Sequence, residues 1–237
     1  MLLTQARTEF VLTLRNAEQV LLTLLIPLGL LVGLTALTVL PVPSPRADNV
    51  TPHILALAVM STAFTGQAIA LGFDRRYGVL KRLAGTALPR WSLVTGRMLA
   101  VLGVVLVQLV VLGVVAAALG WRPEPAGVAP AALLILAGTA AFGALGVLLG
   151  GVLRAEVVLA VANTVWLLLV VAGGIALSVQ TLPGPLSVLV AALPSGTLAE
   201  GLHAALVQGA TPWAALGILL AWAAAAGALA ARTLRLS

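Results

Sequence analysis

The sequence predicts an all-α integral membrane protein whose 237 residues form a single transmembrane domain, and three observations lead to this prediction. Hydrophobic residues make up 61% of the chain and charged residues only 8%, whereas soluble domains are about half apolar and about a quarter charged. Six apolar segments have the length of about 20 residues that crosses a bilayer as a helix. Most of the basic residues fall on one side of the arrangement that these segments imply.

The six predicted transmembrane helices give the chain an even number of crossings. They cover residues 20–40, 53–73, 93–119, 130–153, 157–179 and 212–231. With the N-terminus in the cytoplasm, eleven of the thirteen Lys and Arg residues lie on the cytoplasmic side, and only Arg46 and Arg122 lie outside. Because basic residues favour the cytoplasmic side, we expect both termini there. Twelve arginines against one lysine, in a chain rich in Ala, Gly, Leu and Val, suggest a GC-rich bacterial genome and hence a bacterial cell membrane.

Three segments outside these spans complete the predicted fold. Residues 1–19 combine an apolar stripe at helical spacing with charged residues such as Arg7 and Glu18. This pattern is typical of an interfacial helix. The proline-rich residues 41–52 predict an extended outer loop. Residues 180–211 predict a re-entrant or outer element, because their apolar run is too short to span a bilayer.

A short helix is expected within this outer element. The run Thr197-Leu198-Ala199-Glu200 has the form of a capping box, with Thr197 as the N-cap and Glu200 at the third helical position. Gly209 is expected to end the helix, because glycine commonly occupies the position after a helix C-terminus.

The stretch Phe73–Trp91 holds the densest charge in the chain. Its apolar residues recur in steps of three and four from Phe73 through Tyr77, which predicts one amphipathic helix, and Pro89 is expected to end it. The charged residues of the opposite face are Asp74, Arg75, Lys81 and Arg82. From the residues alone, two interpretations stay open: a helix that lies on anionic lipid, and a docking element for a cytoplasmic partner.

No catalytic residue, cofactor site or metal site is predicted. A P-loop needs a lysine after a glycine-rich loop, and the only lysine, Lys81, lies between Leu80 and Arg82, so the chain has no ATP site of that kind. Cysteine is absent. His53 and His203 fall on the expected outer face, where we expect exposed or interfacial side chains in preference to metal ligands. The net charge of +6 lies beside the spans, which suits lipid headgroups and membrane topology better than nucleic acid.

Two polar residues within the predicted spans are candidates for a translocation path, namely Gln108 and Asn163. The alternative is that they form hydrogen bonds between helices. No ionisable residue lies deep in a span, although ion-coupled transporters generally need one, and this favours a transporter whose energy comes from another chain. Gly146 and Gly150 are expected to let helices pack closely.

The charged stretch also resembles a family pattern. From Asp74 to Arg90 it is similar to the pattern acidic-Arg-x-x-Gly-Thr-Leu-x-Arg-Leu-x-x-Thr-Pro-Leu-x-Arg of type-2 ABC exporter permeases, including the daunorubicin-resistance permease type. Val79 and Ala87 stand where that family often has Thr and Pro. A second similarity is the pair Leu182-Pro183 and Leu193-Pro194 ahead of a short helix, which resembles the family's segment between spans five and six.

This resemblance implies that residues 74–91 form a coupling helix that docks on a separate ATPase chain. The docking residues that it implies are Asp74, Arg75, Arg76, Gly78, Lys81, Arg82 and Thr86. It further implies a permease subunit of an ATP-driven exporter, without catalytic activity of its own, that moves an amphiphilic or hydrophobic substrate such as a drug, a lipid or a lipid-linked glycan out of the cell. The implied partners are the ATPase, membrane lipids and a second permease chain in a homodimer or heterodimer, with the path at the dimer interface and spans one and five at the gate.

One alternative from another functional class stays open. A non-transporting membrane assembly or immunity factor would keep the spans and an interfacial basic helix, but it would not need a coupling helix. An intramembrane enzyme would need a nucleophile or metal ligands within the spans, and the sequence offers none there.

Overall fold

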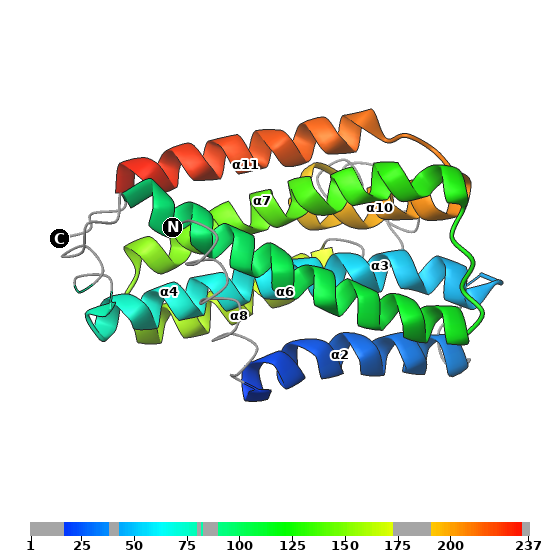
Figure 1. The fold of residues 1–237 in the computed structure, drawn as a ribbon, viewed down its shortest axis with the longest axis horizontal. Coiled ribbons are helices and arrows are strands. Elements are labelled where there is room, and N and C mark those ends of the chain that lie inside the picture. The colour runs from blue at the N-terminus through cyan, green and yellow to red at the C-terminus, as the bar shows by residue number, and fades with distance from the viewer. Residues whose placement is uncertain (1–16, 38–42, 80–81, 83–89, 173–190, 234–237) are drawn as a thin grey trace.

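The computed structural model describes residues 17–37, 43–79, 82, 90–172 and 191–233. Every regular element among these residues is a helix, and most of the helices run along the long axis of a bundle (Figure 1). The elements are α2 (Ala17–Ala36), α3 (Arg46–Met60), the π-helical turn η1 (Ser61–Gly66), α4 (Gln67–Arg76), α6 (Arg90–Ala118), the 3₁₀ turn η2 (Pro125–Gly127), α7 (Val128–Val152), α8 (Ala155–Ala172), α10 (Pro194–Gln208) and α11 (Trp213–Thr233).

Four helical stretches are long and apolar enough to cross a membrane within the described part of the chain. They are Arg46–Arg76, Thr95–Ala118, Pro125–Val152 and Trp213–Thr233. The first and fifth predicted spans correspond to shorter apolar helices, Thr23–Ala36 and Ala155–Val171, and their remaining residues, 38–40 and 173–179, lie outside the described residues. The prediction of an all-helical membrane protein is confirmed, and the count of six crossings stays a prediction. Of the interfacial helix predicted over residues 1–19, residues 1–16 lie outside the described residues and residues 17–19 form the start of α2.

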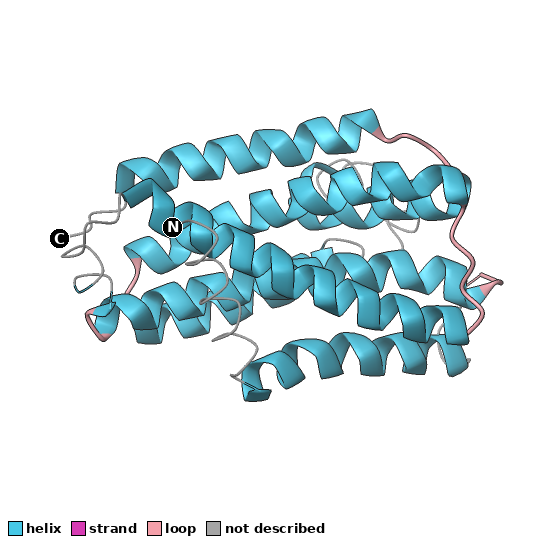
Figure 2. Cartoon of the chain, viewed as in Figure 1, coloured by secondary structure: helices cyan, strands magenta, loops and turns pink. Residues whose placement is uncertain are grey.

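The bundle has two ends of different composition. We call one the basic end, which comprises residues 74–76, Arg97 and residues 150–156. The other is the proline end, which comprises residues 43–53, 119–127 and 200–212. At the proline end the backbone N–H of Glu124 donates to the carbonyl of Leu206 at 2.8 Å, and that of Arg122 donates to Asp48 at 3.0 Å. Figure 2 shows the connecting loops gathered at these two ends.

The predicted outer loop over residues 41–52 is wrong in its second half, because α3 begins at Arg46. The side-chain amide of Asn49 donates to the carbonyls of Pro43 and Pro45, and the Thr51 hydroxyl donates to the carbonyl of Ala47 at 2.7 Å. These bonds support the first turns of the helix. Tertiary packing outweighs the proline content here, since Ala47, Val50 and Thr51 are buried and Pro52 lies inside the helix.

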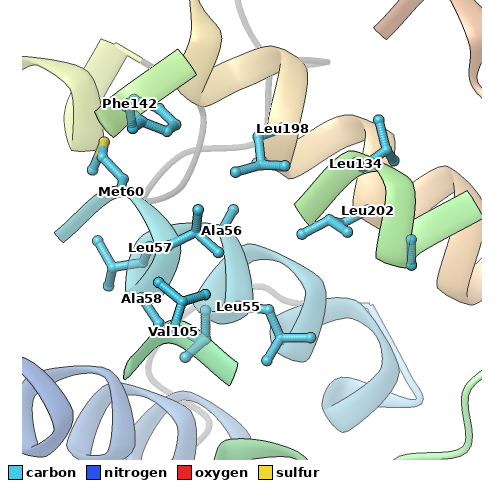
Figure 3. Packing of buried hydrophobic residues seen from close by; sticks show 14 of the residues in the cluster. Leu55, Ala56, Leu57, Ala58, Met60, Val105, Leu134, Phe142, Leu198 and Leu202 are labelled. Atoms are coloured by element: carbon cyan, nitrogen blue, oxygen red, sulfur yellow. The ribbon is translucent and has the colours of Figure 1, made fainter. Parts of the chain in front are cut away.

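The core is shared by α3, α6, α7 and α10, with further side chains from α2, η1 and α11. Met60 of α3 and Val105 of α6 belong to the same buried cluster as Phe142 of α7 and as Leu198 and Leu202 of α10 (Figure 3). Because its leucines are buried among side chains of these helices, α10 belongs to the interior of the bundle.

Glycine permits the close approach of α7 to its neighbours, as predicted for Gly146 and Gly150. A Cβ atom at Gly146 would lie 2.6 Å from the carbonyl oxygen of Phe64, and one at Gly150 would lie 2.4 Å from that of Ala68. At the proline end, a Cβ atom at Gly127 would lie 1.7 Å from the carbonyl oxygen of Ala205. These distances are too short for any side chain, so larger residues at these positions would force the helices apart.

The predicted start of the outer helix is also wrong. Helix α10 begins at Pro194 with Leu193 as its N-cap, and proline suits the first helical position because no helical partner is needed for its missing N–H. Thr197 lies inside the helix and donates its hydroxyl to the carbonyls of Ala191 and Leu193, so Thr197 and Glu200 do not form a capping box. The predicted end is confirmed, since Gly209 follows the helix in a left-handed conformation with φ of 66°.

The predicted amphipathic helix over Phe73–Trp91 is interrupted. Helix α4 ends at Arg76, and Tyr77 and Gly78 form a turn in which Gly78 has φ of 68°. A left-handed glycine directly after a helix is a common termination signal, and it outweighs the apolar spacing that continues through Tyr77. Helix begins again directly after this turn, since Val79 and Arg82 are helical and the backbone N–H of Arg82 donates to the carbonyl of Gly78 at 3.1 Å. Residues 80–81 and 83–89 lie outside the described residues, and α6 begins at Arg90.

Candidate functional site

The basic end joins α4 to α6 through a part-buried ion pair. Arg97, near the start of α6, donates to Asp74 of α4 at 2.6 Å and to the side-chain oxygen of Gln67 at 2.7 Å. The Arg97 and Asp74 side chains are 16% and 33% exposed. Partial removal from water strengthens such a charge-assisted bond, so the two helices are held together at this end.

The same end of α4 also contacts the C-terminus of α7. Arg75 donates to the carbonyls of Gly150 and Leu153 at 3.0 and 3.2 Å. These carbonyls lie at the C-terminal end of α7, where the last carbonyl oxygens of a helix have no hydrogen-bond partner within the helix. A cation there also interacts favourably with the helix dipole, so Arg75 acts as a side-chain cap that attaches α4 to α7.

A third contact reaches α8 across the tight turn between α7 and α8. Arg76 pairs with Glu156, and both side chains are largely exposed. An exposed pair contributes only about 0.2–1 kcal/mol. The turn itself is short, since α7 ends at Val152 and α8 begins at Ala155.

These contacts correct the expected orientation of the charged face. Asp74 and Arg75 were expected to point away from the membrane domain, but both bind within it. The spacing of apolar residues placed them on a polar face, and it carried no information about Arg97 or the α7 carbonyls. Asp74 and Arg97 occupy the adjoining ends of two successive predicted spans, and this opposite-charge arrangement is the signal that would have found the pair.

The residues after α4 are the exposed part of the charged stretch. Tyr77 is 64% exposed and stacks on Phe73 with ring centroids 6.1 Å apart. Arg82 is exposed and donates to the carbonyl of Tyr77 at 3.0 Å. Gly78 provides the turn between them. Lys81 and Thr86 lie outside the described residues, so their docking role stays a prediction.

The first candidate for the translocation path, Gln108, is buried within the chain. Its side chain is 1% exposed, accepts a hydrogen bond from Thr62 at 2.6 Å and donates to Thr23 at 3.1 Å. These bonds connect α6 to η1 and α2 near the middle of the bundle. Gln108 therefore fits the alternative of hydrogen bonding between helices, and in this structure it faces no open surface.

The second candidate, Asn163, lies on an exposed face of α8. Among the described residues, its amide donates to the carbonyl of Leu159 within its own helix. The exposed residues of this face are Val157, Leu159, Ala160, Asn163, Thr164, Leu167, Leu168 and Val171. They recur at helical spacing, so α8 presents one largely apolar stripe with two polar residues near its centre.

At the proline end the structure brings together both histidines of the chain. His53 of α3 and His203 of α10 have ring centroids 5.7 Å apart, and Glu200 and Asn49 lie beside them. We call these four residues the histidine cluster. Within the described ranges, no group of three or more His, Cys, Asp or Glu residues has the arrangement of a metal site. The sequence placed both histidines at the same end with Glu200 one turn from His203, but it did not indicate Asn49.

Comparison with protein families gives a match to the family described as ABC-2 type transporter, over residues 2–207. No curated protein matches the chain.

Proposed function

The chain belongs to the ABC-2 type transporter family and is a membrane permease subunit, and we propose that it serves an exporter that moves an amphiphilic or hydrophobic substrate out of the cell. A separate ATPase chain supplies the energy, and the permease has no ATP site of its own. The observation that carries the proposal is the attachment of α4 to three other helices at the basic end, directly before the exposed turn at Tyr77. A force applied to that turn would reach α6, α7 and α8 together.

In this proposal the ATPase docks on the segment from Tyr77 to Arg90. Tyr77 and Arg82 offer an exposed aromatic ring and an exposed cation, which suit a partner surface that is apolar with acidic residues. Lys81, Arg82 and Thr86 are the remaining docking residues that the family pattern implies. The docking segment is attached to the bundle by Asp74, Arg75 and Arg76, through their contacts with α6, α7 and α8.

A second permease chain would cover the exposed face of α8. The face is apolar and continuous, and Asn163 and Thr164 lie near its centre. In a membrane, polar residues on such a face commonly pair between helices. This placement supports a dimer whose path runs beside α8, with Asn163 as the path residue that remains after Gln108 is assigned to packing.

The experiment is co-purification with the ABC ATPase encoded nearest to this gene. Wild-type protein is compared with Tyr77→Ala plus Arg82→Ala, and with Arg122→Ala at the proline end as a matched loss of an arginine. We expect the wild type and Arg122→Ala to retain a stoichiometric ATPase and the double variant to lose it. If wild-type protein retains no ATPase, the exporter proposal fails, and a non-transporting assembly becomes the better description. If the double variant retains it, the docking surface is elsewhere.

A further inference from the structure

The turn between α7 and α8 carries an arginine whose charge has no partner. Arg154 is exposed, and its guanidinium forms no hydrogen bond or ion pair with any residue that the structure describes. The nearest carboxylate along the chain, Glu156, pairs with Arg76 instead. The basic end as a whole holds four arginines and two carboxylates, which leaves a net charge of +2 there.

The backbone that carries Arg154 is held on both sides. The Arg75 guanidinium donates to the carbonyl of Leu153, directly before it, at 3.2 Å. The carbonyl of Arg154 itself accepts from the backbone N–H of Val158 at 2.8 Å. The arginine side chain is therefore presented from a fixed backbone, which lowers the ordering cost of binding a partner.

Apolar side chains flank Arg154 on both helices. Val152, in the last turn of α7, is 54% exposed, and Val157, in the first turn of α8, is 44% exposed. Val152 ends a helical stretch that is long and apolar enough to cross a membrane, and Val157 begins the exposed apolar stripe of α8. An arginine between two such side chains lies at the boundary of the hydrocarbon, where its long side chain reaches the headgroup layer.

Two other arginines of the described part also form no bond through their guanidinium groups, but their surroundings differ. Arg122 lies beside carboxylates, since its backbone donates to Asp48 and Glu124 follows two residues later. Arg232 lies in the last turn of α11, where the negative end of the helix dipole favours a cation. Arg154 instead precedes α8, whose first turn is the positive end of that helix. Of the three, Arg154 has the least local compensation.

We propose that Arg154, together with Val152 and Val157, binds the phosphate of an anionic glycerophospholipid in the leaflet at the basic end. The guanidinium presents its N–H groups as a fork that matches phosphate oxygens, and the two valines contact the first methylene groups of the acyl chains. A zwitterionic phospholipid offers the same phosphate, but its own ammonium group offsets the attraction. The site therefore prefers a lipid of net negative charge, by about fivefold for one arginine near the membrane surface.

An acidic surface of a soluble partner is the other chemistry that suits an unpaired arginine. The exposed valines favour the lipid, because the partner of Arg154 has to share this position with the acyl chains that cover Val152 and Val157. The second permease chain proposed above would cover α8, and Val152 lies on α7 beside it, so the lipid would lie at the rim of that interface. The inference requires that the chain spans a membrane, and it does not depend on the ATPase or on the exported substrate.

The experiment measures the binding of single lipids to the purified chain by native mass spectrometry in detergent. Phosphatidylglycerol and phosphatidylcholine with the same acyl chains are compared, and glycerol 3-phosphate supplies the headgroup phosphate without chains. We expect the wild type to bind the first phosphatidylglycerol about fivefold more tightly than phosphatidylcholine, without competition from an equal concentration of glycerol 3-phosphate. Competition at that concentration would indicate a site for free phosphate and would overturn the lipid assignment.

Three variants identify the group that is responsible. Arg154→Gln should lower the affinity for phosphatidylglycerol about fivefold and leave that for phosphatidylcholine unchanged, whereas Arg154→Lys should keep most of the preference. Arg122→Gln is the matched loss of an exposed arginine and should behave as the wild type. The proposal is overturned if Arg154→Gln keeps the wild-type preference, or if Arg122→Gln loses as much. An Arg154→Gln variant that keeps its lipid preference but loses a co-purifying ATPase would assign the arginine to the soluble partner instead.

A second readout locates the bound lipid. The chain has no cysteine, so a fluorophore attached to the variant Val152→Cys reports on lipids beside the end of α7. Phosphatidylglycerol brominated on its acyl chains should quench this fluorophore more strongly than brominated phosphatidylcholine, and the added change Arg154→Gln should remove the difference. Equal quenching by the two lipids while Arg154 is present would place the anionic lipid elsewhere and overturn the proposal.

Discussion

The basic end and the proline end hold the same bundle together by different chemistry. At the basic end, three arginines bind carboxylates and helix carbonyls, and arginine keeps its charge at every physiological pH. At the proline end, α3 meets α10 through two histidines, an asparagine and a glutamate. At the basic end charge-assisted bonds therefore link α4 to its neighbours, whereas at the other end the polar contacts add to the apolar core that α3 and α10 share. The difference indicates that α4 is held mainly by charged side chains and α10 mainly by the burial of residues such as Leu198 and Leu202.

The largest effect should come from the glycine contacts that bring helices together at each end. Gly127→Ala should destabilise the protein by about 3 kcal/mol, because its methyl group would meet the Ala205 carbonyl. Gly150→Ala at the basic end should cost somewhat less, because its contact with the Ala68 carbonyl is less severe. Thermal unfolding in detergent measures both.

Gly227→Ala provides the control for these two changes. Nothing lies within 4 Å of a Cβ atom at Gly227, and alanine within a helix is about 0.5–1 kcal/mol more favourable than glycine. The unfolding temperature should therefore stay the same or rise. A fall equal to that of Gly127→Ala would show that the close approach at Gly127 is not the cause.

The next effect concerns the part-buried ion pair at the basic end. Arg97→Ala should cost about 1–3 kcal/mol, since it leaves Asp74 and Gln67 without their donor. The exchange Asp74→Arg plus Arg97→Asp should recover part of this loss. Unfolding temperatures of the two single variants and the double variant measure the coupling between the residues. Additive losses without recovery would mean that the two side chains do not interact.

A smaller effect is expected for the exposed pair of Arg76 and Glu156. Arg76→Ala should cost about 0.2–1 kcal/mol, and the loss should shrink as salt is raised, because ions screen exposed charges. The measurement is the unfolding temperature at low and high salt. A large loss that does not respond to salt would place Arg76 among the buried contacts with Arg75 and Arg97.

The smallest effect should appear at the proline end. Because the contact with His53 lowers the pKa of Glu200, its ionised form contributes stability above its usual titration range, and this contribution is lost as the pH falls through the lowered pKa. Glu200→Gln should remove this acid-dependent part of the stability. A series of unfolding temperatures at mildly acidic pH tests it, and identical profiles for wild type and variant would contradict the assignment.

Hydropathy was sufficient to predict the helices but not their contacts. The apolar runs located α6, α7 and α11 to within a few residues, because burial in lipid requires long apolar helices. The early start of α3 does not follow from hydropathy, since its first turns are held by hydrogen bonds of the Asn49 and Thr51 side chains and by the burial of Ala47 and Val50. The capping box failed because Pro194 and Leu193 supplied an earlier start for α10.

The candidate site was predicted in its location and not in its geometry. The charged stretch was correctly identified as unusual, but the partners of Asp74 and Arg75 lie on α6 and α7. No local pattern encodes such pairs. Glycine commonly ends helices, so Gly78 is a signal for the turn, whereas the apolar spacing that continues through Tyr77 predicts an unbroken helix. The histidine cluster required knowledge that α10 lies against α3.

The π-helical turn Ser61–Gly66 lies between the two ends, within the continuous helix from Arg46 to Arg76. A π-helical turn accommodates an additional residue, and one residue rotates an α-helix by about 100°. The turn therefore sets the angular phase between α3, which packs on α10, and α4, which packs on α7 and α8. Deletion of a single residue there would restore a regular α-helix and leave its two halves out of register with their neighbours, so that His53 and Arg75 could not both meet their partners. This one extra residue acts as an angular offset that lets a single helix serve both ends of the molecule.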